Sequence, residues 1–127
     1  HKSQALAEIL NAKSGDTKVT SASIRDIRAE DLSGIVNATP VGMKKLPGSA
    51  VPIRLLKPKI WVADIVYFPL KTELLATAEA IGCRTLPGSG MAVFQAVRAF
   101  ELFTGLKADA KRMLASFDTL SKEISPN

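Results

Sequence analysis

The chain has 127 residues, of which 46% are hydrophobic and 23% charged, a composition typical of a folded globular domain rather than of a disordered or fibrous chain. Its formal net charge of +5 comes from basic residues scattered along the sequence in small pairs, which argues against a nucleic-acid partner. The longest apolar run, residues 60–66, contains Asp64 and is much shorter than the roughly 20 residues that a membrane-spanning helix needs. We therefore expect a soluble, cytoplasmic protein that binds neither nucleic acid nor membrane.

Side chains for metal, thiol or hydrolytic chemistry are scarce. Cys83 is the single cysteine and His1 the single histidine, so neither a zinc site nor an internal disulfide can be assembled. A Ser-His-Asp or Cys-His arrangement lacks its histidine for the same reason. No metal ligand is therefore assigned, and Cys83 is interpreted as a small buried residue in a strand.

The first half of the chain predicts short helices and strands. Leu6, Ile9 and Leu10 lie on one face of an opening helix that Gly15 stops. The elements expected next are a strand at residues 18–21, an irregular helix at 24–32, a strand at 35–39 that Pro40 ends, and one helical turn at 53–56.

The second half predicts longer elements. The apolar stretch 60–67 is typical of a parallel strand with helices on both faces, and Thr72 and Gly82 bound the helix that follows. A strand at 83–86, a helix at 90–104 stopped by Gly105, and a last helix complete the chain. The side chains expected to face the core are Leu74, Leu75, Ala78 and Ile81 in the first of these helices, Val93, Ala96, Val97, Phe100 and Phe103 in the second, and Met113, Phe117, Leu120 and Ile124 in the third.

Strands alternating with helices predict the α/β class with a parallel sheet, in which ligands bind beyond the carboxyl ends of the strands. Taken alone, the polar residues there favour modest roles: a chain-reversing turn after residue 37, a loop held by Asp64, a half-buried Tyr67 and a solvated Gln95. Residues 88–90 (GSG) follow a strand and open a helix. However, Val93 stands where the third glycine of a dinucleotide fingerprint would fall, so that fingerprint is absent.

Four segments, in this order and spacing, resemble the C-terminal half of the shikimate dehydrogenase family, most closely its quinate/shikimate dehydrogenase branch. They are residues 37–43 (NATPVGM), 61–69 (WVADIVYFP) with 72–75 (TELL), 88–91 (GSGM) with Gln95, and 103–105 (FTG). The resemblance runs from the first helix to Met113. It implies a partial Rossmann-like parallel sheet with flanking helices whose first two strands are missing. Residues 1–127 would form the C-terminal part of a dinucleotide-binding domain, with helices at about 90–124 closing toward a substrate domain absent from this chain.

The resemblance also implies reversible hydride transfer, with NAD or NADP as cofactor, between shikimate or quinate and the 3-dehydro ketone. In family members, the residues matching Tyr67 and Gln95 contact the substrate. The implied cofactor contacts are Asn37, Thr39, Pro40, Val66, Gly88 and Met91. The family's catalytic Lys and Asp lie in the substrate domain, which this chain does not match. No catalytic residue is therefore assigned, and we expect the chain to be part of a longer enzyme and inactive alone.

Two further hypotheses stay open beside the dehydrogenase. The chain is alternatively a noncatalytic nucleotide-binding remnant that serves as an assembly module, or a relative acting on a different small ring or a tetrahydrofolate substrate. NAD and NADP, shikimate and quinate, a biosynthetic role (aromatic amino acids) and a catabolic one (quinate), and a monomer and a homodimer also stay open.

Overall fold

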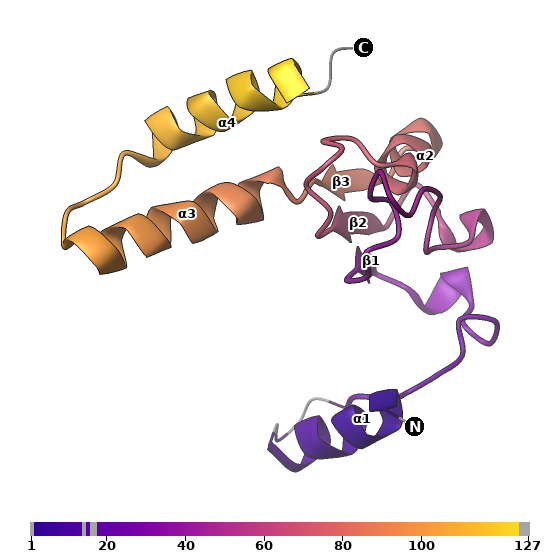
Figure 1. Cartoon of the computed structure of the whole chain (residues 1–127). Helices are drawn as coiled ribbons and strands as arrows, with labels where there is room; N and C mark the ends of the chain where they lie inside the picture. Colours follow the sequence, from indigo (N-terminus) through magenta and orange to yellow (C-terminus); the bar gives the residue numbers. More distant parts are fainter. Residues whose placement is uncertain (1, 14, 16–17, 125–127) are drawn as a thin grey trace. The chain divides into compact units, whose positions relative to one another are not determined.

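The computed structural model describes residues 2–13, 15 and 18–124, which fall into two compact units, His1–Asp31 and Leu32–Asn127 (Figure 1). The first unit contains helix α1 (Lys2–Lys13) and a short 3₁₀ helix, η1 (Ala29–Asp31). The irregular helix expected at 24–32 is thus reduced to a turn and η1. On α1, Ala7 is buried, whereas the predicted apolar face is exposed at Leu6, Ile9 and Leu10.

The strand expected at residues 18–21 does not form. The carboxamide of Asn11 holds both backbone polar groups of Val19: its Nδ2 donates to the Val19 carbonyl at 2.8 Å and its Oδ1 accepts from the Val19 N–H at 2.7 Å. These are the groups that a strand would use for its ladder, so the side chain of α1 replaces the neighbouring strand as their partner.

The second unit contains the predicted parallel sheet. Its strands β1 (Gly34–Asn37), β2 (Trp61–Asp64) and β3 (Arg84–Leu86) lie in the order β1-β2-β3, and both neighbouring pairs are parallel. The register pairs Gly34 with Trp61 and Asn37 with Asp64. The carboxyl ends of β1 and β2 therefore lie side by side, and the parallel sheet confirms the α/β class.

Strand β2 differs from its prediction in length and in coverage. It ends at Asp64 rather than near Tyr67, because the N–H of Val66 turns to the Asp64 carboxylate instead of continuing the ladder. Its burial alternates: Val62 and Asp64 are buried, whereas Trp61 is exposed. Within the second unit, the face of β2 that carries Val62 and Asp64 is therefore buried, and the face that carries Trp61 is not.

Helix α2 (Glu73–Ile81) packs against β2 and β3 and follows its prediction closely. Thr72 caps its N-terminus by accepting a hydrogen bond from the Leu75 N–H at 3.3 Å, and Gly82 ends it in the left-handed conformation at φ +92°. Leu74, Leu75 and Ala78 are buried, and together with Val62 they form the centre of the core. The turn expected at 53–56 is the 3₁₀ helix η2 (Ile53–Leu55).

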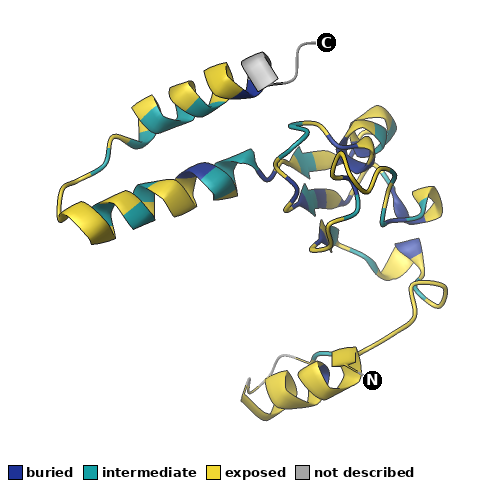
Figure 2. Ribbon diagram, viewed as in Figure 1, coloured by how far each residue is buried: buried dark blue, intermediate teal, exposed yellow. Residues whose placement is uncertain are grey.

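Helices α3 (Ser89–Thr104) and α4 (Ala110–Ile124) pack against each other, and Gly105 ends α3 as predicted (Figure 1). Their predicted core-facing stripes are wrong in part, since Val93 is buried but Phe100, Phe103 and Leu120 are exposed (Figure 2). The side chain of Ile124 lies outside the described residues. Across the residues described here, no helix is both long enough and apolar enough to span a membrane.

Candidate functional site

A buried carboxylate, Asp64, lies at the carboxyl end of the central strand. Its Oδ1 accepts hydrogen bonds from the Asn37 Nδ2 and from the Val66 N–H, both at 3.0 Å. Its Oδ2 accepts from the Thr72 hydroxyl at 2.7 Å. Asp64 and Thr72 are 3% and 1% exposed. The interpretation of Asp64 as a residue that holds a loop is confirmed.

Asn37, at the end of β1, uses its whole carboxamide inside the chain. Its Nδ2 donates to the Val41 carbonyl at 2.9 Å as well as to Asp64, and its Oδ1 accepts from the Thr39 N–H at 3.1 Å and the Thr39 hydroxyl at 2.7 Å. Two donors and two acceptor sites are all that a carboxamide offers. The side chain therefore shapes the turn after β1, while Thr39 and Pro40 are exposed on that turn.

The loop after β2 carries Val66 and Tyr67. Val66 is buried, whereas Tyr67 is 48% exposed, one residue further along. The N–H of Ile65 donates to the Asn37 carbonyl at 3.1 Å, so this loop leaves the sheet alongside the turn after β1. The peptide bond between Phe68 and Pro69 is cis.

The segment after β3 approaches the same loop through Gly88. A Cβ at this buried glycine would lie 2.6 Å from the Ile65 carbonyl oxygen and 2.8 Å from that of Val66. The absence of a side chain thus lets the beginning of α3 lie directly against the chain leaving β2. Met91 and Gln95 follow on the first two turns of α3, and both are exposed.

All eight residues implied as ligand contacts lie at the carboxyl end of β1, in the segments that follow the three adjacent strands, or on the first two turns of α3. Asn37 adjoins Asp64, and Gly88 adjoins Val66. Sequence reasoning missed the second bond of Thr72, which was expected only to cap α2. The signal was a buried Asp eight residues before a Thr, but only the loop geometry brings the two together.

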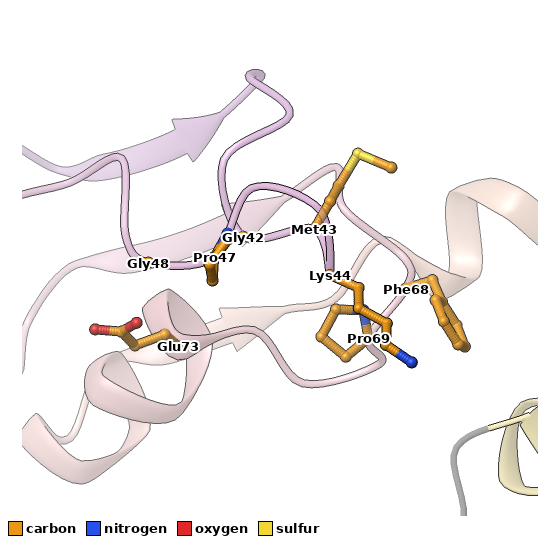
Figure 3. A pocket seen from close by; sticks show the side chains of 8 residues that line it. All are labelled: Gly42, Met43, Lys44, Pro47, Gly48, Phe68, Pro69 and Glu73. Atoms are coloured by element: carbon orange, nitrogen blue, oxygen red, sulfur yellow. The ribbon is translucent and has the colours of Figure 1, made fainter.

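A cavity of about 270 Å³ lies between the loops that follow β1 and β2 (Figure 3). It is lined by Gly42, Met43, Lys44, Pro47, Gly48, Phe68, Pro69 and Glu73. Lys44 and Glu73 are the charged residues of this lining, and none of the eight implied contacts belongs to it. This cavity and the implied contacts are therefore different features of the same edge of the sheet.

A parallel sheet with a helical crossover and polar loops beyond its carboxyl edge defines the class of Rossmann-like α/β domains. The sequence profile of the "Shikimate 5'-dehydrogenase C-terminal domain" family matches residues 88–116. The chain is 52% identical over 122 residues to a shikimate dehydrogenase (NADP(+)) of Streptomyces avermitilis, with 94% of this chain and 42% of the relative covered. It is 46% identical over 121 residues to a quinate/shikimate dehydrogenase (NAD(+)) of Corynebacterium efficiens, with 94% and 43% covered.

Among solved structures, the quinate dehydrogenase of Corynebacterium glutamicum in complex with NAD superposes with a TM-score of 0.81 at 45% identity, covering 93% of this chain and 43% of that one. The predicted resemblance to the C-terminal part of shikimate and quinate dehydrogenases is confirmed, as is the Rossmann-like fold. The chain thus spans less than half of the length of these relatives, 42–43% in each case.

Proposed function

We propose that this chain supplies the C-terminal, cofactor-facing part of an NAD- or NADP-dependent shikimate or quinate dehydrogenase. The observation that carries the proposal is the 52% identity over 122 residues to a shikimate dehydrogenase (NADP(+)). The geometry agrees with it, because the implied contacts all fall at the edge of the sheet where Rossmann-like domains bind their ligands.

The residues present suit the cofactor's reactive ring rather than its phosphates. Thr39, Pro40 and Met91 are exposed at the carboxyl edge, whereas a Gly-x-Gly-x-x-Gly turn does not occur in the sequence. Val66 and Gly88 are buried, and their proposed role is to contact such a ring through their backbone atoms. When bound, the cofactor supplies the hydride for reduction of the ketone or accepts it in the reverse reaction.

Tyr67 and Gln95 are the proposed substrate contacts. A phenol and a carboxamide each donate and accept hydrogen bonds, which matches a ring that carries several hydroxyl groups. Both side chains are exposed and therefore accessible to a small molecule. No residue of this chain is assigned as the acid or base that moves the hydroxyl proton, so we propose that the chain does not catalyse the reaction alone.

The test uses the full-length protein that contains this chain. Tyr67→Phe and Gln95→Ala should each raise the KM for shikimate or quinate about 3- to 10-fold, the effect of losing one hydrogen bond to an uncharged group. The Kd of NAD or NADP, measured by calorimetry, should stay within about twofold because neither side chain is placed on the cofactor. Gln4→Ala on α1 is the matched control, since Gln4 is an exposed glutamine that is not among the proposed contacts.

Unchanged KM values in both variants would contradict the substrate assignment. A wild-type protein that binds nucleotide but turns over neither substrate would instead favour the noncatalytic module. Turnover on quinate compared with shikimate, each with NAD and with NADP, identifies the substrate and the cofactor.

A further inference from the structure

Asp64 is buried at the sheet edge, and its side chain accepts hydrogen bonds from three residues, one at the end of β1 and two in the loop after β2. Through Asn37 it reaches the turn after β1, through the Val66 N–H it holds the beginning of the loop after β2, and through Thr72 it holds the end of that loop. Asn37 extends the connection by donating also to the Val41 carbonyl, and Thr72 extends it to the N-terminus of α2.

We propose that Asp64 is a positioning residue that couples the turn after β1 to the loop after β2, so that Thr39 and Pro40 move as one unit with Tyr67. This inference rests on the proposed function, because it makes the cofactor side and the substrate side of the site depend on one carboxylate. Asp64 itself touches neither ligand, since it is 3% exposed and its oxygens are used within the chain.

The identity of the side chain follows from its partners. Asn37 Nδ2 and the Val66 N–H can only donate, and the Thr72 hydroxyl donates to Asp64 while its oxygen accepts from the Leu75 N–H. An ionised carboxylate accepts on both oxygens and donates nothing, so it satisfies all three donors at once. An amide at position 64 would turn an N–H toward one of these donors and leave it without an acceptor.

Thr72→Val tests the coupling because it removes the hydroxyl and keeps the shape of the side chain. Backbone hydrogen exchange in the full-length protein should become at least tenfold faster at Val66. It should also become at least tenfold faster at Thr39 and Val41, which lie more than thirty residues before Thr72 in the sequence. The amides of Thr39 and Val41 are the sensitive probes, since both donate to side chains of the turn that Asn37 shapes. Thr72→Ser retains the hydroxyl and should restore exchange to within about twofold of wild type.

The same variant should raise the Kd of NAD or NADP and the KM of the substrate together by about threefold or more, with Thr72→Ser again close to wild type. Thr85→Val is the matched control. It also removes a Thr hydroxyl that donates to a carboxylate, that of Glu79 at 3.0 Å, but on the exposed side of α2 and β3. It should leave exchange at Thr39 and Val41, the Kd and the KM unchanged.

The proposal is overturned if Thr72→Val accelerates exchange only around α2, or if it lowers the melting temperature while the Kd and KM stay at wild-type values. If Thr72→Val is not recovered folded, Asp64→Asn decides by the same criteria, because it preserves the size of the side chain. A wild-type protein that binds no nucleotide would refute the proposed function alone, since hydrogen exchange still reports the coupling.

Discussion

Gly88 offers the sharpest test of how the beginning of α3 is placed. Gly88→Ala would put a Cβ 2.6 Å from the Ile65 carbonyl oxygen, 2.8 Å from its carbon and 2.8 Å from the Val66 carbonyl oxygen. Ordinary contacts begin near 3.4 Å, and here every neighbour is backbone, which cannot rotate away. The beginning of α3 must therefore move by several tenths of an ångström away from the chain that leaves β2.

The expected cost follows from two opposing effects. Overpacking of a tight contact costs about 1–3 kcal/mol. Gly88 has φ −70° and ψ −9°, a conformation that any residue adopts without strain. Alanine therefore also stabilises the folded protein by about 0.4–1 kcal/mol, because it restricts the conformations of the unfolded chain. We expect a net loss of about 1–2 kcal/mol in the free energy of unfolding. Because Met91 and Gln95 move with α3, the proposed function adds a weaker affinity for both cofactor and substrate.

The assay is urea unfolding of the full-length protein followed by circular dichroism, with Gly90→Ala as the control. A Cβ at Gly90 meets nothing within 4 Å, so this substitution in the same helical turn should be neutral or should stabilise by up to about 1 kcal/mol. Equal unfolding free energies for the two variants would refute the argument that the close approach at Gly88 requires glycine.

Two other predictions concern surface features. Lys71 pairs with the Glu79 carboxylate and Thr85 donates to it, and these contacts, that of Lys71 first, hold the pKa of Glu79 below its ordinary value of 4.5. The lowered pKa contributes stability above about pH 4.5 that is lost as the pH falls through the folded pKa. Lys71→Met should therefore raise the pKa of Glu79 in an NMR titration, and an unmoved titration would contradict this. Gly34→Ala would place a Cβ 2.0 Å from Cε2 of Trp61, so the indole must move away from β1. The fluorescence of Trp61, the single Trp of this chain, should shift to the red and be quenched more easily by acrylamide, and an unchanged spectrum and quenching would contradict this.

The elements that the sequence predicts correctly are those whose signals are local. Thr72 and Gly82 bound α2 as expected, because a side-chain cap and a left-handed glycine act within one turn of the helix. The parallel pairing of the strands also follows, since strands that alternate with helices favour a parallel sheet.

The errors arise where a distant partner decides the outcome. The strand expected around Val19 fails because Asn11, eight residues earlier, takes both of its backbone polar groups. The apolar stripe of α3 is buried at Val93, but Phe100 is 41% and Phe103 90% exposed, so within the second unit only the beginning of the stripe is fully covered. A periodic pattern shows which face of a helix is apolar, but only the fold determines whether another element covers that face.

The hydrogen bonds of Asn37 also depend on contacts that the sequence pattern does not show. A resemblance can imply that Asn37 adjoins a cofactor, but it does not say which atoms are available, and here Thr39, Val41 and Asp64 already occupy the whole carboxamide. Any contact at this position must therefore involve the backbone that Asn37 holds in place. The polar residues of the edge divide by exposure: Asn37 and Asp64 are buried and set the path of the chain, whereas Thr39 and Tyr67 are exposed and are the proposed ligand contacts. It follows that removing the hydroxyl of Tyr67 should affect one ligand, whereas breaking the Asp64 network should affect both.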